Sequence, residues 1–427
     1  MNTLELEEVQ VIEEKELSLV DFYNLQGMDM MEKASKFNSM LEKDVFTKRL
    51  FQQKIVACSP SAPVRSVKDV YSGHTKQMFQ FASNDYLNLA NHPKVVEAGV
   101  EAVRKYGAGP GSAPLLGGAF EMNIELEQRI AKFKHAESAL VYPVGFSSNS
   151  STLISLLQKD DLAILDMLVH ASIVDGCKNT NLKHFKHNDI ASLEMVLKKT
   201  KGEYRTRLVI VDGVYSMDGD IAPLDQIVAL AKYYGAYVMI DDAHSTGVLG
   251  ENGRGTSEYF GVEGQVDIIS GTFSKALGGV GGFIAAKKEL VELLGYCSRG
   301  FMFSTAMAPQ VCASVLAALD IIEQEPERRV RLWKNIRYFK NSLLNLGFNV
   351  SHVESAIFPI ITGDDQITKA LWTDLFESNI YVGPVLYPAV PKRLSRVRIS
   401  LMADHTQEHL DTLLTVLASL GKKYDLI

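Results

Sequence analysis

Residues 208–241 have the sequence LVIVDGVYSMDGDIAPLDQIVALAKYYGAYVMID, and this stretch decides the fold of the chain. Its two apolar runs, 208–211 and 237–240, are nearly free of polar residues, as strands of a parallel sheet covered on both faces should be. Between them, residues 223–235 have apolar side chains at helical spacing, which predicts a strand–helix–strand crossover. A third apolar run, VDII at 266–269, follows. The stretch therefore predicts an α/β fold with a central, mostly parallel sheet.

The same alternation of short apolar runs and helical segments extends from about residue 81 to about residue 310. Beyond it, two long helical patterns and three short apolar runs are typical of a smaller α+β unit. We predict an N-terminal arm or extension at residues 1–80, a large α/β domain at 81–310 and a C-terminal α+β domain at 311–427. The first residues combine an acidic head with a helix-like stretch and contain no recognisable chemical motif.

The bulk composition excludes several classes of function. The chain has 427 residues, 44 basic and 51 acidic side chains and a formal charge of −7, which disfavours a nucleic-acid partner. No apolar run has the roughly 18 residues that span a bilayer, and the acidic start differs from a secretory signal. We expect a cytoplasmic protein, with peripheral membrane contact left open. The four scattered cysteines lack metal-site spacing, so we expect free thiols and no metal.

Polar residues follow the three apolar runs, at the edge of the sheet where ligands of such folds bind. The third run leads into GTFSKALGG (271–279), in which Lys275 follows the hydroxyl residues Thr272 and Ser274. A desolvated lysine can condense with an aldehyde while the hydroxyls and nearby N–H groups bind a phosphate. The lysine of a lone Ser-Lys dipeptide more often lies in a solvated loop. The prediction of a Schiff-base lysine therefore depends on the accompanying motifs.

The second motif is IDDAHSTG (240–247), at the end of the preceding strand. A buried Asp241 carboxylate facing a pyridine nitrogen would keep that nitrogen protonated, although an isolated strand-end aspartate is more often a turn residue. His244 can donate to a phenolic oxygen on the same ring. Together with Lys275, these residues predict pyridoxal 5′-phosphate (PLP) as the cofactor.

Two weaker motifs support this prediction. VGFSSNSS (144–151) places the backbone N–H groups of Gly145, Phe146 and Ser147 at a helix start, where they can bind the phosphate. LVHASIVDG (168–176) contains His170, which can stack on the cofactor ring, although a lone histidine among apolar residues is more often only packed. The prediction rests on the whole set.

Taken in this order, the motifs resemble the α-oxoamine synthase family of fold-type-I (aspartate aminotransferase-like) PLP enzymes. The resemblance extends from about residue 75 to the C-terminus. Within the family, the detailed sequence of these motifs is most similar to that of bacterial serine palmitoyltransferases. The matching stretches are FASNDYLNL, GFSSN, HASIVDG, DGVYSMDGDIAPL, IDDAHSTGVLG, GTFSKALGG, FMFSTAMAP and RVRISLMADHT.

The resemblance implies a homodimer with active sites at the subunit interface. It implies Schiff-base, ring-nitrogen and ring-stacking roles for Lys275, Asp241 and His170. By the same resemblance, Ser216 and His244 contact the phenolic oxygen, Thr272 binds the phosphate, and Asn84 and Arg398 bind substrate. Ser304 and Thr305 match positions that reach the neighbouring subunit's phosphate.

Two features leave the substrate open. Pro114, in GAGPGSAPLLGGA, stands where the family usually has an arginine, so this segment's part in substrate or thioester recognition is undecided. Only Arg398 is expected to pair with a carboxylate, but Arg393 and Arg396 lie beside it in RLSRVRIS.

The implied reaction joins a small amino acid to an acyl thioester and releases CO2 and thiol. Serine is the favoured amino acid, with glycine or alanine as alternatives, and the acyl carrier is coenzyme A or an acyl carrier protein. Activities of the 8-amino-7-oxononanoate synthase or 2-amino-3-ketobutyrate CoA ligase type are alternatives within the family. A transaminase on the same fold and a noncatalytic partner subunit are the competing hypotheses.

Overall fold

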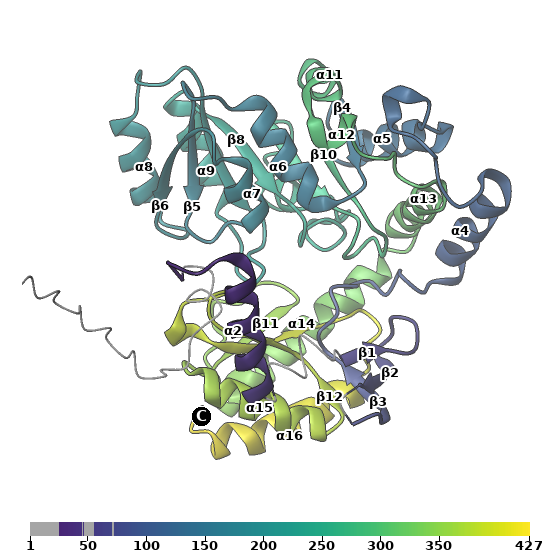
Figure 1. Ribbon diagram of the computed structural model, residues 1–427, viewed down its shortest axis with the longest axis vertical. Helices are drawn as coiled ribbons and strands as arrows, with labels where there is room; N and C mark the ends of the chain where they lie inside the picture. Colours follow the sequence, from purple (N-terminus) through teal and green to yellow (C-terminus); the bar gives the residue numbers. More distant parts are fainter. Residues whose placement is uncertain (1–24, 45, 47–54, 71) are drawn as a thin grey trace, which may run out of the picture.

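The computed structural model describes residues 25–44, 46, 55–70 and 72–427. Figure 1 shows two lobes, the first built on a seven-stranded sheet and the second containing the C-terminal helices. The large sheet has the strand order β4-β10-β9-β8-β7-β5-β6. Only β10 is antiparallel to its neighbours, so the predicted mostly parallel sheet is confirmed. The strands are β4 (Ser138–Tyr142), β5 (Leu162–Asp166), β6 (Asn181–Phe185), β7 (Arg207–Asp212), β8 (Tyr237–Asp241), β9 (Ile268–Thr272) and β10 (Gly282–Ala286).

Both faces of this sheet are buried, which explains why its central strands are apolar throughout. Side chains alternate across β7, so that Val209 and Val211 belong to one hydrophobic cluster and Leu208 and Ile210 to the other. Helices α5, α8, α9 and α13 contribute to the first cluster, and α6, α7 and α11 to the second. The helices of this lobe are α4 (Pro93–Tyr106), α5 (Glu121–Phe133), α6 (Gly145–Leu156), α7 (Ala171–Gly176), α8 (Ile190–Lys199), α9 (Leu224–Tyr233), α10 (Thr256–Tyr259), α11 (Lys288–Cys297), α12 (Arg299–Met302) and α13 (Pro309–Gln324), with a 3-10 turn η2 (Pro114–Leu116).

The second lobe contains two small sheets. One has the order β11-β14-β13, and the other has the order β1-β2-β3-β12, in which β3 pairs in parallel with β12. Residues 55–80, within the segment predicted as an arm, therefore form three strands of a sheet that the C-terminal part completes. Residues 1–24 of that predicted arm lie outside the described residues. The elements are α2 (Met30–Lys43), β1 (Ile55–Ala57), β2 (Val64–Asp69), β3 (Thr75–Gln80), α14 (Glu327–Leu346), β11 (Ile357–Ile361), α15 (Asp365–Glu377), β12 (Ile380–Tyr381), β13 (Gly383–Val385), η3 (Lys392–Leu394), β14 (Arg396–Ser400) and α16 (Gln407–Lys423).

The strands predicted at 208–211 and 237–240 are present as β7 and β8, and the third begins two residues later than its apolar run. The strand begins after Asp267 because this residue ends the preceding loop, where its side chain accepts a hydrogen bond from the Val238 amide at 2.8 Å. Among the helices that the structure describes, none is both long and apolar enough to cross a membrane.

A buried ionic contact ties together the loops that lie at the carboxyl edge of the large sheet. His187 follows β6, and its two ring nitrogens contact Asp166 at 3.0 Å and Asp220 at 2.7 Å. Asp166 ends β5, and Asp220 closes the turn after β7 that carries Ser216. Burial alone would lower the pKa of His187, but hydrogen bonds to the two carboxylates and their charges outweigh it and raise the pKa to about 10. The imidazolium therefore holds three loops in register.

We predict a pH-dependent loss of stability when His187 is replaced by glutamine. The folded-state pKa of about 10 lies above the ordinary value of 6.5, so the stabilisation is complete below pH 6.5, declines above it and is lost beyond pH 10. Thermal unfolding of H187Q and wild type should therefore differ by roughly 2 kcal/mol at pH 6 and converge toward pH 10. The exposed His184 on β6 offers the control H184Q. A difference that is zero at pH 6 would contradict the role of the ionic contact.

Candidate active site

Lys275 lies in the loop that follows β9, between the buried residues Phe273 and Ala276. Its side chain is only partly accessible to solvent. Burial lowers the pKa of Lys275 to about 8, while the negative charge of Asp241 opposes this shift and the positive charge of Arg398 adds to it. A larger fraction of the amine is therefore neutral near pH 7 than in an ordinary lysine, and the neutral amine is the nucleophilic form.

Asp241 ends β8 and is buried, as its position in IDDAHSTG predicts. One carboxylate oxygen accepts a hydrogen bond from the Asn149 amide at 2.7 Å, and the other accepts one from the backbone N–H of Ala243 at 3.0 Å. Asn149 is itself held, because it accepts from the Ser270 hydroxyl and donates to the Ser172 hydroxyl at 2.9 Å. The orientation of the carboxylate is therefore set by a connected network of side chains.

Asp212 lies beside Asp241 in the register of β7 and β8. Burial raises the pKa of Asp212 well above its ordinary value, and the neighbouring Asp241 carboxylate raises it further. Two adjacent buried carboxyls resist simultaneous ionisation. Asp241 accepts hydrogen bonds from two donors, the Asn149 amide and the Ala243 N–H, which suits it to a cationic partner.

His170 caps the N-terminus of α7, and its Nδ1 lies 2.7 Å from the Ser172 hydroxyl. Its backbone N–H donates to Asp212 at 3.3 Å. The ring itself is exposed, so one face is open to a flat ligand. Burial lowers the pKa of His170, the charge of Asp241 raises it and that of Lys275 lowers it. The charges of Asp241 and Lys275 therefore both act on the His170 ring, which indicates that the three residues lie around one space.

The start of α6 packs against the end of β9. A Cβ atom on Gly145 would lie 2.8 Å from the Thr272 hydroxyl, so only glycine permits this approach of the helix. The Thr272 hydroxyl in turn contacts the Ser274 hydroxyl at 2.8 Å. Residues Gly145, Phe146 and Ser147 form the first turn of α6, where N–H groups have few intrahelical acceptors. The Ser147 N–H already donates to the Val144 carbonyl at 3.1 Å, so of the three predicted donors Gly145 and Phe146 fit a phosphate best. Backbone donors, a helix N-terminus and two hydroxyls thus form a cradle suited to a phosphate.

Arg398 on β14 brings the second lobe into the site. Both terminal nitrogens of its guanidinium donate to the Asn84 side-chain oxygen at 3.1 Å, and Nε donates to the Ser216 carbonyl at 2.6 Å. Asn84 and Arg398, the two residues predicted to bind substrate, are therefore in direct contact. Ser216 also lies here, but its contact with Arg398 is made by the backbone.

The structure distinguishes the three neighbouring arginines. Arg396 is buried and paired with Asp218 at 2.7 Å, whereas Arg393 is exposed. Arg398 is buried, and its hydrogen-bond acceptors are an amide, a carbonyl and the Ser400 hydroxyl. Within the described parts of the chain it forms no ion pair with a carboxylate. A buried guanidinium of this kind is suited to the carboxylate of a small ligand.

Two groups of predicted residues lie elsewhere. Ser304 and Thr305 follow α12, and in the described residues no hydrogen bond links them to Lys275. Their neighbour Ala306 instead donates to the Ser112 carbonyl at 3.1 Å, beside the segment that contains Pro114. Pro114 begins η2 and lines a mostly apolar cavity of about 260 Å³ with residues of α5, β4 and α11. Within the described residues, neither Ser304 nor Thr305 makes a side-chain hydrogen bond to Gly145, Thr272 or Ser274.

Sequence reasoning missed the side chains that support the site. Asn149 and Ser270 hold Asp241, Ser172 contacts both Asn149 and His170, and Tyr86 contacts His244. A signal was present for Asn149, because it stands four residues after Gly145 and so lies one helical turn below the cradle. Ser270 and Tyr86 gave no local signal, since their partners are distant in sequence.

The residues present fit PLP. The cradle offers neutral and partly positive donors for its phosphate, Lys275 offers an amine for its aldehyde, and Asp241 offers a carboxylate for its ring nitrogen. The open face of His170 matches the flat ring. These groups come from four different strand ends, as the fold requires of a site at the carboxyl edge of the sheet.

Comparison with known proteins agrees with this site. The sequence model of the aminotransferase class I and II family matches residues 76–417. The 8-amino-7-oxononanoate synthase of Symbiobacterium thermophilum is 44% identical over 371 residues, covering 86% of this chain and 93% of that protein. The 8-amino-7-oxononanoate synthase 1 of Bacillus subtilis is 43% identical over 354 residues, covering 82% and 90%.

A solved structure is also similar along its whole length. It is a lysine-to-alanine variant of serine palmitoyltransferase from S. paucimobilis, bound to an aldimine of PLP and myriocin. Its TM-score is 0.88 at 32% identity, and the match covers 94% of this chain and 100% of that one. The predicted fold type and cofactor are thereby confirmed, together with the resemblance to the α-oxoamine synthases.

Proposed function

Because this chain belongs to the aminotransferase class I and II family, we propose that it is a PLP-dependent acyltransferase that forms an α-amino ketone. In this reaction a small amino acid and an acyl thioester give the amino ketone, CO2 and free thiol. The observation that supports the proposal is that the charges of Asp241 and Arg398 both act on the buried Lys275 amine, in the loop after β9 at the carboxyl edge of the sheet. A noncatalytic partner subunit would need none of them.

Each residue has a defined task. Arg398 binds the amino-acid carboxylate through its guanidinium fork, oriented by Asn84 and the Ser216 carbonyl. The neutral Lys275 amine accepts the proton from the α-carbon. Bound PLP supplies an electron sink for the negative charge that develops at this carbon.

With PLP bound, Asp241 would hold a positive charge on the ring nitrogen and His170 would pack against the ring. Ser216 and His244 lie where the family contacts the phenolic oxygen. The α-carbon then forms its new bond to the acyl carbon, and the C–S bond breaks to release a thiolate, which takes a proton from solvent. Loss of CO2 from the former carboxyl group leaves an electron pair on the α-carbon, and the protonated Lys275 amine returns its proton there. Removal of the carboxylate breaks the contact with Arg398 and favours product release.

Exposed apolar side chains beside the cradle and beside Ser304 support a proposal about subunit assembly. Val144 and Phe146 border Gly145, Met167 and Leu168 precede His170, and Phe303 precedes Ser304 with 74% of its surface exposed. Apolar side chains of this size gathered at one site favour an interface. We propose a homodimer in which Ser304 and Thr305 of one subunit complete the phosphate cradle of the other.

Two subtypes of this reaction class are candidates, and they differ in their substrates. The amino-acid sequence of the motifs favours the serine palmitoyltransferase type, and the similar solved structure carries that name. The higher identity of 44% to proteins named 8-amino-7-oxononanoate synthase favours that type as the second candidate. Both names fit the same reaction class. The amino acid, chosen among serine, alanine and glycine, and the acyl carrier are therefore the quantities to measure.

We predict that the holoenzyme releases free thiol and CO2 in equal amounts when it receives one amino acid of this set and a matching acyl thioester. Borohydride reduction followed by peptide mass spectrometry should find the pyridoxyl group on Lys275. K275A should lose both the label and at least about a thousandfold of turnover, since it lacks the amine and the base. The exposed Lys287 provides the control K287A. Amino-group transfer without CO2 would indicate a transaminase, and no PLP binding would indicate a noncatalytic subunit.

A second prediction concerns the arginine. R398K keeps the positive charge but loses the planar fork, so the KM for the amino acid should rise roughly 10- to 100-fold while the KM for the acyl thioester stays unchanged. R393K, at an exposed position on the preceding 3-10 turn, serves as the matched control. Equal rises in both KM values would show that Arg398 supports the fold rather than the amino acid.

The dimer gives a third prediction, independent of turnover. Light scattering should give twice the 47.2 kDa chain mass. F303E should shift the protein toward the monomer because it places a charge in the apolar contact, and PLP retention should weaken with it. Y259K, which changes an exposed aromatic residue on α10, is the control. A wild-type monomer that retains PLP fully would contradict the shared site.

A further inference from the structure

A chain of polar contacts connects His244 to Arg398 through two side chains that precede α4. The Tyr86 hydroxyl lies 2.7 Å from Nδ1 of His244 and 3.3 Å from the side-chain oxygen of Asn84. That same oxygen accepts from Arg398. The contacts join residues 158 and 314 positions apart in sequence. Tyr86 therefore stands between the residue expected at the cofactor's phenolic oxygen and the residue expected at the substrate carboxylate.

The Tyr86 hydroxyl has only one proton to donate. The Asn84 oxygen offers two lone pairs, and the two terminal N–H groups of Arg398 already approach it at 3.1 Å. The hydroxyl also lies closer to His244, at 2.7 Å, than to Asn84, at 3.3 Å. A hydroxyl contact at 2.7 Å has the length of a strong hydrogen bond, whereas 3.3 Å is long. The hydroxyl therefore donates to Nδ1 of His244.

The protonation of both partners agrees with this direction. Burial raises the pKa of Tyr86, so its hydroxyl keeps the proton. Burial lowers the pKa of His244 well below its ordinary value, and the positive charges of Lys275, Arg398 and His170 lower it further. His244 is therefore neutral, with one N–H group and one acceptor nitrogen.

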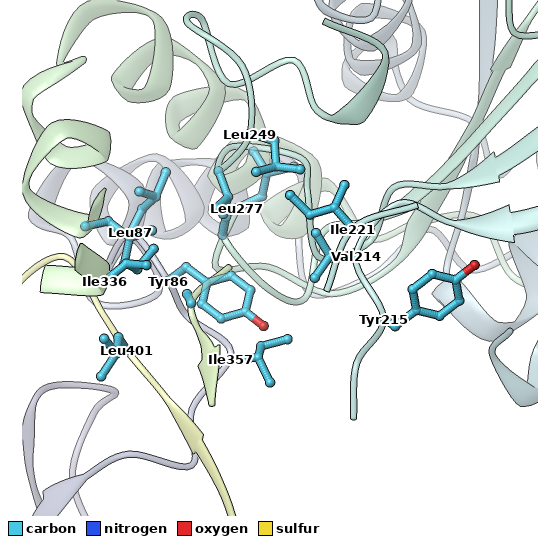
Figure 2. Close-up of a cluster of buried hydrophobic side chains, with 14 of the residues drawn as sticks. Tyr86, Leu87, Val214, Tyr215, Ile221, Leu249, Leu277, Ile336, Ile357 and Leu401 are labelled. Carbon is cyan, nitrogen blue, oxygen red and sulfur yellow. The ribbon is translucent and has the colours of Figure 1, made fainter. Parts of the chain in front are cut away.

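The Tyr86 ring cannot readily turn its hydroxyl elsewhere. It is 1% exposed and belongs to the hydrophobic cluster that also contains Leu87, Leu277 and Ile357. Figure 2 shows the ring within this cluster, with its hydroxyl at one end. Packing thus fixes the position from which the proton is donated.

We propose that Tyr86 is a positioning residue that keeps the proton of His244 on Nε2. The nitrogen that points away from Tyr86 is then always a donor, which is the form required to bind an anionic phenolic oxygen. This inference rests on the proposed function for the identity of the cofactor, but the tautomer itself depends only on residues of this chain. A second consequence is that the hydrogen bond is established before any ligand binds.

The tautomer can be read directly by nitrogen-15 NMR of histidine-labelled holoenzyme, with the His244 signals assigned from an H244Q sample. In the wild type, Nε2 should show the shift of a protonated ring nitrogen and Nδ1 that of an acceptor nitrogen. In Y86F, which keeps the ring and removes the donor, the two shifts should move toward each other as the tautomers mix. Wild-type protonation of Nδ1 would overturn the proposal without the need for any variant.

The control is Y142F, which removes another buried tyrosine hydroxyl, bonded to Ser298 at 3.0 Å. It should leave the His244 shifts unchanged. Y86F should also lower kcat about tenfold, the rate equivalent of one hydrogen bond, and move the pH profile of the cofactor's visible absorption. Unchanged His244 shifts in folded, PLP-loaded Y86F would overturn the proposal. If the enzyme lacks thioester activity but the wild type shows Nε2 protonation, the proposed function fails while the tautomer assignment stands.

Discussion

The electrostatic attraction between Lys275 and Asp241 is the interaction on which the rest of this site depends. Burial alone would deprive Lys275 of its charge, and the Asp241 carboxylate opposes that loss, so that the pKa stays near 8 instead of falling further. The lysine is thereby kept close to the point at which it is both available as an amine and able to take up a proton. Asn149 and the Ala243 amide keep the carboxylate in place, which explains why Asn149 is buried inside the lobe.

A second constraint links the lobes. Arg398 extends from the C-terminal sheet to Asn84 in the segment before α4 and to the turn after β7. That turn is tied in its own right by His187 between Asp166 and Asp220. The carboxylate site is therefore assembled from three distant segments, each of which is held by charge or by hydrogen bonds. Such assembly gives rigid positioning without a large number of contacts to the ligand.

Local patterns were sufficient for the elements and the principal chemical groups. The apolar runs predicted β7 and β8, because a strand buried on both faces needs no polar residue. Lys275, Asp241, His170 and Gly145 were predicted because each stands at a strand end or helix start, and the side chains at such positions face the ligand edge of a parallel sheet. Asn149, Ser270 and Tyr86 could not be predicted in this way, since their partners lie elsewhere in the chain.

By itself, then, the amino-acid sequence determined the α/β fold, the family and the cofactor, since these follow from periodicity and from motifs that are continuous in the chain. Only the tertiary structure decided the environment that distinguishes Arg398, which the resemblance had already singled out, from its two neighbouring arginines. It pairs Arg396 with Asp218, leaves Arg393 exposed and directs Arg398 to Asn84. The physical reason is that hydrogen bonds and charge pairing depend on distances between segments, and those distances exist only after the two lobes have packed together.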